Sequence, residues 1–419
     1  MNTHIYRGNI LYTPDKNGFV SVPGGYIAVR NGKVSGISKT LPEEYAGIPV
    51  KDYGEKLIIP AFSDMHVHAS QYAQRGTGMD KLLPDWLNTY TFPEECKFAS
   101  LSYASPLYAS FTDGLRKNGT FHSCIFATIH RDATLELAKA IENAGMCALV
   151  GKVNMDRSAP DFLCENTEKS IRDTEDFILG FGNFSNVRPI ITPRFAPTCT
   201  NELLTGLGKL SRKYGIGVHT HLEESIWEAD EAKRLFPDCS CDAEIYEKSG
   251  LLGNGPAVFA HFIFPAARDN EILRKYGALA VHCPDATANI IAGIMPVKKL
   301  LDAGISIALG SDVGSGPDLP VYRQISRAVQ LSKLLTFFEP ENGGILSFSE
   351  AFFMGTRAAS AVFPGTGAFE PGCRFDALVL DIQDDPGSIK SPEEKLERFC
   401  YAGDDRNIVA GFCGGRKIL

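Results

Sequence analysis

Residues 57–68 read LIIPAFSDMHVH, an apolar run that continues into two histidines, His66 and His68. Side chains two positions apart on a strand point to the same face of the sheet. Two imidazoles on one inward face would waste core volume unless something binds them. The stretch therefore predicts a buried strand whose carboxyl end carries a binding site.

Short apolar runs of this kind recur through the middle of the chain and alternate with longer helix-like segments. The runs are residues 57–62, 121–129, 147–153, 187–192, 216–221, 257–262, 278–282 and 306–309, and the helix-like segments include 133–144 and 201–214. Eight runs separated by helices predict an α/β fold, a closed TIM-type (β/α)8 barrel. A doubly wound open sheet is the second possibility, but Glu370 stands where its third fingerprint glycine should follow Gly365 and Gly367.

Both ends of the chain differ from this middle. The pair Asn31-Gly32 lies between two short strand-like runs, which is the strongest short hairpin signal. The C-terminal segment has similar short runs, such as residues 377–380. We therefore predict a small β-sandwich domain built from residues 1–60 and 365–419, beside a catalytic barrel of residues 61–364.

The overall composition excludes several classes of partner. The 419 residues carry a net charge of −8 with no long run of like charge, which leaves no electrostatic footprint for nucleic acid or an anionic membrane. No apolar run reaches membrane-spanning length, and the first residues lack the layout of a signal peptide, so a cytoplasmic location is expected. The 11 cysteines are scattered and odd in number, without a CxxC pair, which favours reduced thiols.

Polar residues gather at the carboxyl ends of the predicted strands, where the active residues of such a barrel lie. They are His66, His68, His219, His221, His261, His282, Ser311 and Asp312, with Glu224 three positions beyond His221. Histidine nitrogens and a carboxylate converging from several strands form a ligand set that zinc prefers, with an open position for water. A metal-dependent catalytic site is the interpretation that this pattern favours.

Not every histidine fits that interpretation. A lone histidine near a strand end is more often a packed core residue than a ligand, and we adopt this interpretation for His122 and His130. His221 is favoured over His219 as a ligand because Glu224 follows it at the spacing of a ligand and its proton shuttle. His219 can instead fill a deeper layer of the barrel.

Two further positions stay open on the sequence alone. His282 is a candidate substrate-binding residue, although a residue that supports the site from behind and a purely structural residue fit the sequence equally well. Asp312 could simply cap the next helix, a common role of aspartate. Its place after the last apolar run, beside glycines, favours a site residue.

Several longer stretches resemble the guanine deaminases of the amidohydrolase superfamily. The stretches are HVHASQY (66–72), YTFPEE (90–95), FATIH (126–130), VGKVNMD (150–156), ITPRF (191–195) and GDDRN (403–407). They occur in the family's order from about residue 55 to the C-terminus. The resemblance implies a hydrolase that acts on a cyclic amidine C–N bond, converting guanine and water into xanthine and ammonia.

The resemblance also implies a role for each site residue. The zinc ligands would be His66, His68, His221 and Asp312; the proton-handling residues would be Glu224, His261 and Asp312; and the purine would be held by Gln71, Arg194 and Phe195. One zinc ion per chain is expected, because the bridging lysine of binuclear relatives is missing after the fourth strand, although iron or manganese can occupy such a site. A homodimer is also implied.

The loop after the seventh strand departs from the family. The family usually has HCPNSN where this chain has His282-Cys283-Pro284-Asp285-Ala286-Thr287. Asp285 could be solvated or cap a helix, or it could face the purine beside His282 as an acceptor-only anion. In the second case the preference would shift toward another aminopurine, such as an 8-substituted guanine.

Other functions remain as alternatives. The same mechanism could serve a different amino-heterocycle, such as a pterin or a triazine. A non-catalytic scaffold related to the amidohydrolases is a more distant alternative, and it should have lost ligands that are present here. The PCxxC signature of the cytidine deaminase fold is absent, which excludes that route to deamination.

Overall fold

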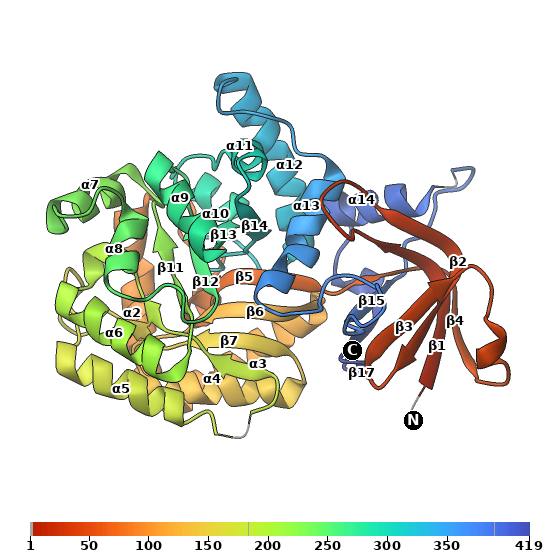
Figure 1. Ribbon diagram of the computed structural model, residues 1–419, viewed down its shortest axis with the longest axis horizontal. Helices are drawn as coiled ribbons and strands as arrows, with labels where there is room; N and C mark the ends of the chain where they lie inside the picture. Colours follow the sequence, from red (N-terminus) through yellow and green to blue (C-terminus); the bar gives the residue numbers. More distant parts are fainter. Residues whose placement is uncertain (1–2, 183, 389) are drawn as a thin grey trace.

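The computed structural model describes residues 3–182, 184–388 and 390–419, and it consists of a helix-covered body beside a sheet that contains both ends of the chain (Figure 1). The body contains two four-stranded parallel sheets with orders β5-β6-β7-β9 and β11-β12-β13-β14. The strands are β5 (Phe62–His68), β6 (Thr120–Phe126), β7 (Cys147–Gly151), β9 (Val187–Pro189), β11 (Val218–Leu222), β12 (Ala257–His261), β13 (Leu279–His282) and β14 (Ser306–Leu309).

The two parallel sheets are linked at both of their seams. An isolated parallel bridge joins Ile191, just after β9, to Val218 at the start of β11. At the other seam, the backbone N–H of Asp312 donates to the carbonyl of His66 over 2.9 Å. A further short parallel pair is formed by β8 (Val153–Asn154), which follows β7 in the sequence, and β10 (Thr192–Pro193), which follows β9.

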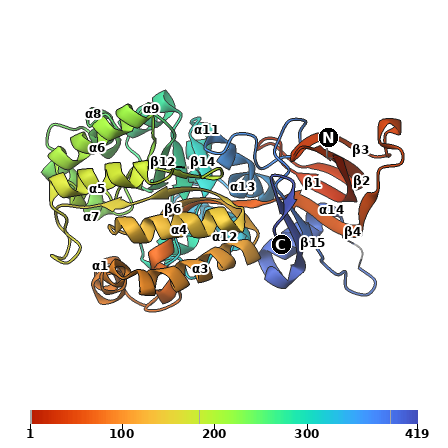
Figure 2. The same ribbon diagram turned by 90° about the horizontal axis from the view of Figure 1, so that it is seen from below.

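Helices cover the parallel strands on both sides, with α3 and α4 on one side and α6, α8 and α9 on the other (Figure 2). The longer helices are α3 (Leu101–Lys117), α4 (Arg131–Ala144), α5 (Thr167–Leu179), α6 (Asn201–Tyr214), α7 (Ile226–Leu235), α9 (Ala267–Tyr276), α12 (Val321–Phe338), α13 (Phe348–Gly355) and α14 (Pro392–Ala402). The shorter ones are α1 (Leu83–Trp86), α2 (Phe92–Cys96), α8 (Asp242–Lys248), α10 (Pro284–Asn289) and α11 (Val297–Asp302).

The predicted helical segments are confirmed in α4 and α6. In α6 the hydroxyl of Thr200 accepts from the backbone N–H of Leu203 and satisfies a free amide of the first turn. Gly215 ends the helix in the left-handed conformation that a residue without Cβ adopts at little cost. Across the described ranges, no helix combines the length and the apolar character needed to cross a membrane.

The two ends of the chain form one separate sheet of seven strands, in the order β17-β16-β15-β4-β1-β2-β3. Its strands are β1 (Thr3–Tyr12), β2 (Val20–Arg30), β3 (Lys33–Ser38), β4 (Val50–Pro60), β15 (Ala377–Leu380), β16 (Ile408–Cys413) and β17 (Arg416–Lys417). The predicted hairpin is confirmed, since Asn31 and Gly32 both have positive φ between β2 and β3. Instead of the two facing sheets expected for a sandwich, the described strands are hydrogen-bonded as one sheet, because β1 pairs along both of its edges.

The run 57–62 is divided between the two parts of the molecule, which corrects its prediction as the first strand of the barrel. Residues up to Pro60 belong to β4, which pairs with β1 and β15 in the terminal sheet. Pro60 has no N–H to donate, and the next amide, that of Ala61, bonds to Asp376. The parallel strand then begins at Phe62, so that both histidines lie at its carboxyl end.

Candidate active site and metal centre

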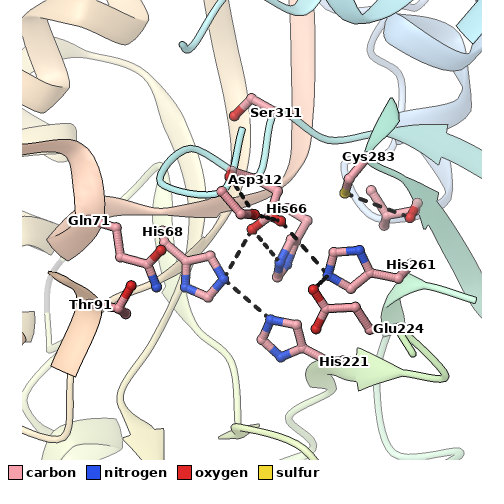
Figure 3. A network of polar contacts seen from close by, with 12 residues as sticks. His66, His68, Gln71, Thr91, His221, Glu224, His261, Cys283, Ser311 and Asp312 are labelled. Atoms are coloured by element: carbon pink, nitrogen blue, oxygen red, sulfur yellow. Dashed lines mark hydrogen bonds and ion pairs between the residues drawn. The ribbon is translucent and has the colours of Figure 1, made fainter. Parts of the chain in front are cut away.

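Five side chains from four chain segments converge at the carboxyl ends of the parallel strands (Figure 3). Asp312 Oδ1 lies 3.3 Å from His66 Nε2 and 3.2 Å from His68 Nε2, and its Oδ2 lies 3.9 Å from His261 Nε2. His221 Nε2 lies 3.3 Å from His68 Nε2. These residues and Glu224 form three overlapping groups whose ligand atoms lie within 4.8 Å of one another.

The polar atoms of this cluster fit a bound cation. His66 Nε2 and both ring nitrogens of His261 are buried without a hydrogen-bond partner among the described residues. A buried polar atom left without a partner costs about 1–3 kcal/mol, so such atoms are normally satisfied by something. Imidazole nitrogens and a carboxylate oxygen are donors that zinc accepts. The residues present therefore fit one divalent metal ion.

Hydrogen bonds behind the cluster orient two of its histidines. His221 Nδ1 donates to the carbonyl of Arg194 over 2.6 Å, so its Nε2 carries the free lone pair and faces the cluster. His66 Nδ1 lies 2.9 Å from His219 Nε2, which leaves His66 Nε2 on the cluster side. His219 thus lies behind His66, as the deeper-layer alternative expected, and acts as its hydrogen-bond partner.

The backbone is strained where these residues lie. Glu223, His261, Phe262 and Asp312 all have positive φ, between 47° and 75°, although none of them is glycine. Such conformations cost about 1–3 kcal/mol each and persist where the surrounding structure enforces them, often at active sites. Asp312 is held there by two backbone bonds, its N–H to His66 and its carbonyl from Gly316.

The pKa values of the two carboxyl groups at the cluster are pushed apart. Burial raises the pKa of Glu224 well above its usual value, and the negative charge of Asp312 adds to the effect. Burial also opposes ionisation of Asp312, but the imidazoles of His66 and His68, 3.3 and 3.2 Å from its Oδ1, outweigh burial and hold its pKa well below the usual range. Burial lowers the pKa of His261 to about 3. Two carboxyl groups with opposite shifts are the arrangement that divides acid and base roles.

A pocket opens directly beside the cluster. It is lined by His68, Gln71, Leu83, Trp86, Leu87, Arg194, Phe195, His221, Glu224, Ser225, Trp227, Glu228, Asp312 and Ser315. The structure therefore brings Gln71, Arg194 and Phe195 together with Glu224 and three of the expected metal ligands. An apolar and aromatic wall with a few polar groups is typical of a small-molecule site.

Asp285 is not among the residues that line this pocket, and its contact with the purine stays a prediction. Its carboxylate accepts from Arg327 Nε over 2.6 Å and from Gln324 Nε2 over 2.9 Å, both on α12. The chain turns into α10 at Pro284, and the carboxylate of Asp285 pairs with the cation of Arg327.

His282 is likewise not among the residues that line the pocket, and its contact with substrate stays a prediction. It ends β13 fully buried, and burial lowers its pKa to about 3. It lies close enough to His261 to contribute to the lowered pKa of that ring, which fits a residue that supports the site. His122 has the structural role expected of it, since its Nε2 lies 3.0 Å from Asp376 Oδ2.

Two site residues escape sequence reasoning. Ser315 donates its hydroxyl to Asp312 Oδ2 over 2.5 Å. Glu95 accepts from Gln71 Nε2 over 3.0 Å and from Arg194 Nη1 over 2.7 Å. The only signal for Glu95 is its place in the stretch YTFPEE, because nothing in a single sequence tells which of two adjacent glutamates turns inward.

Comparison with known proteins agrees with this geometry. The amidohydrolase family matches residues 57–418. The chain is 37% identical to a guanine deaminase of Dictyostelium discoideum over 380 residues (88% of this chain, 84% of the relative) and 30% identical to one of Escherichia coli strain K12 over 413 residues (95% and 91%). It superposes on a crystal structure of guanine deaminase from C. acetobutylicum with bound guanine in the active site, with a TM-score of 0.96, 42% identity and full coverage of both chains. The chain belongs to the amidohydrolase family, within which it groups with the guanine deaminases.

Proposed function

We propose that the chain catalyses the hydrolytic deamination of guanine to xanthine and ammonia, with one zinc ion held by His66, His68, His221 and Asp312. The proposal rests on one observation: Glu224 and three of the proposed metal ligands line the same pocket as the residues expected to bind the purine, which are Gln71, Arg194 and Phe195. The similarity to a structure described as having guanine in its active site supports the choice of substrate.

The metal would supply one part of the chemistry. A zinc ion at this cluster would activate a water molecule for attack at neutral pH. Iron or manganese can occupy such a nitrogen and oxygen site, and the donor set favours zinc among them.

Three side chains would handle the protons of the reaction. Asp312, which is ionised, accepts a proton from the attacking water. Glu224 delivers a proton to ring nitrogen N3, which makes C2 electrophilic, and recovers one from the hydroxyl group added at C2. The C2–O bond forms, the bond from C2 to the amine breaks, and the proton on Asp312 leaves with the amine as ammonia. His261 would donate a hydrogen bond to the developing oxyanion.

Gln71 and Arg194 would hold the polar edge of the purine by hydrogen bonds. The ring of Phe195 would pack on the purine face, and Trp227 supports it, with ring centroids 6.3 Å apart. Because the carboxylate of Asp285 is engaged with α12, the departure of its loop from the family gives no ground for a different purine.

The finer architecture belongs to the same proposal. Residues 61–364 would close into an eight-stranded (β/α)8 barrel, supported by the bonds at both seams of the parallel sheets. Residues 1–60 and 365–419 would form the second domain around the terminal sheet. A homodimer remains a prediction from the family resemblance.

Ammonia release from a panel of heterocycles tests the function. Zinc-loaded protein is incubated with guanine, an 8-substituted guanine, a pterin and a triazine, and xanthine is identified by chromatography. We expect guanine to give the highest kcat/KM, with one xanthine formed per ammonia. Faster ammonia release from a pterin or a triazine than from guanine would make that heterocycle the preferred substrate. Ammonia release from none of the compounds would overturn the assignment of an enzyme of this class.

A further inference from the structure

Glu95 holds both residues to which the proposed function assigns the polar edge of the purine. It lies on the short helix α2 and is 2% exposed. One carboxylate oxygen accepts from Gln71 Nε2 over 3.0 Å, and the other accepts from Arg194 Nη1 over 2.7 Å. Helix α2 thereby links two binding residues that lie far apart in the sequence.

The first of these bonds determines which way the Gln71 amide faces. An ionised carboxylate can only accept hydrogen bonds, so the NH₂ group of Gln71 must point toward Glu95. The other end of the amide lies against Gly314, where an added Cβ would be 2.1 Å from Gln71 Oε1. Gly314 has a φ of 116°, which residues with a side chain rarely adopt. Glu95 thus orients the amide, and the amide oxygen is left as the free acceptor.

The second bond, from Arg194 Nη1 to Glu95, holds in place the guanidinium group that offers hydrogen-bond donors to the pocket. Arg194 is 5% exposed, and its guanidinium carbon lies 5.3 Å from the ring centroid of Phe92, which is also on α2. Its charge is compensated by Glu95, while its remaining N–H groups stay available to the pocket that it lines. Arginine has no acceptor atom, so this position can only donate.

We propose that Glu95 is a positioning residue that sets the hydrogen-bond pattern of the pocket, with an acceptor at Gln71 Oε1 and donors at Arg194. This pattern is complementary to a ring N–H beside a carbonyl, such as N1–H and O6 of guanine. It opposes 2,6-diaminopurine, which carries the same amine at C2 but has an acceptor at N1 and a donor at position 6. The inference rests on the proposed function, since it concerns how that substrate is recognised.

The test compares kcat/KM for guanine and for 2,6-diaminopurine in wild type and in Glu95→Gln. A glutamine at position 95 can present either an oxygen or an NH₂ group to Gln71, so the Gln71 amide is free to turn over. Sites built on such hydrogen bonds discriminate by about 10⁴ or more. We expect Glu95→Gln to lower the ratio of kcat/KM for guanine to kcat/KM for 2,6-diaminopurine by about 10- to 100-fold. The loss should come chiefly through a higher KM for guanine, and the metal content should not change.

The adjacent residue provides a matched control. Glu94→Gln removes a carboxylate from the same helix, but Glu94 bonds to Lys97 and Tyr103, whereas Glu95 bonds to Gln71 and Arg194. We expect its efficiency ratio to equal that of wild type. If Glu95→Gln does not fold, Glu95→Asp takes its place, because it keeps the charge beside Arg194 but withdraws the carboxylate by about 1.5 Å. It too should lower the ratio.

Each result has one meaning. Wild type inactive on guanine would refute the proposed function, and the inference with it. With active wild type, an unchanged ratio in both Glu95 variants, or an equal loss for both purines, would show that Glu95 only supports the fold. A reduced ratio in a Glu95 variant but not in Glu94→Gln supports the inference.

Discussion

Glu224 lies at the turn into α7, where its backbone N–H donates to the carboxylate of Glu228 over 2.9 Å. Its own Oε1 is 3.6 Å from His261 Nε2, at the edge of the metal cluster. A largely buried carboxyl group at this position can carry a proton between the substrate and its surroundings, whereas an amide cannot.

Glu224→Gln keeps the size of the side chain and removes proton transfer. We expect kcat to fall by about 10²–10⁴-fold or more, since general acid–base catalysis contributes that much, while metal content stays the same. Glu231→Gln, a half-buried position of α7 whose carboxylate pairs with Arg234, is the control and should keep wild-type turnover. Near-normal turnover of Glu224→Gln, measured by ammonia release, would show that Glu224 is only a structural carboxylate.

The histidines differ in what their removal should do to the metal. Elemental analysis of wild type should find about one divalent ion per chain, as in a catalytic site with three or four protein ligands. His68→Ala should lose most of that ion, because His68 Nε2 faces both Asp312 and His221. His282→Gln should retain it. Two ions per chain, or full activity after thorough chelation, would contradict a single catalytic metal.

At the scale of elements, α10 and α12 are joined by Asp285, which bonds to Gln324 and Arg327. Asp285→Asn should lower the free energy of unfolding by roughly 0.5–1 kcal/mol, the range of a partly exposed ion pair. Thermal denaturation measures that loss. Because Asp285 does not line the pocket, the relative efficiencies on guanine and its analogues should not change. A changed substrate preference would mean that α10 reaches the substrate after all.

At the scale of the whole molecule, a buried histidine–aspartate contact joins the parallel strands to the terminal sheet. Asp376, just before β15, lies 3.0 Å from His122 of β6 and 3.1 Å from Arg374. Burial opposes the ionisation of Asp376, but His122 and Arg374 outweigh burial and lower its pKa to about 2. A depressed pKa of this kind stabilises the folded protein above the unfolded value of about 3.9, and the contribution is lost as the pH falls toward 2.

Asp376→Asn removes this dependence on pH. Between pH 6 and pH 3, wild type should lose about 1 kcal/mol more of its free energy of unfolding than the variant does. Urea denaturation of both proteins at the two pH values gives the difference, and effects of acid on the metal site are common to both. Equal losses would mean that Asp376 is not held in its ionised form by the fold.

The sequence by itself determined the order of strands and helices, since the spacing of apolar residues is a local property of the chain. The histidines at 66, 68 and 221 could also be singled out, because two imidazoles on one strand face have few other uses. The resemblance to the guanine deaminases then named Gln71 and Arg194. These predictions needed no knowledge of which segments meet in space.

Only the tertiary structure decided which partner each side chain meets. The continuous run 57–62 does not show that its first part pairs with β15, far along the chain, while its last residue opens another sheet. His219 and His221 look equivalent in sequence, yet one lies behind His66 and the other faces His68. Asp285 pairs with Arg327 on α12, and Glu95 accepts hydrogen bonds from Gln71 and Arg194. Hydrogen bonds and ion pairs between distant segments depend on distance and direction in the folded chain, and neither is written in a local pattern of residues.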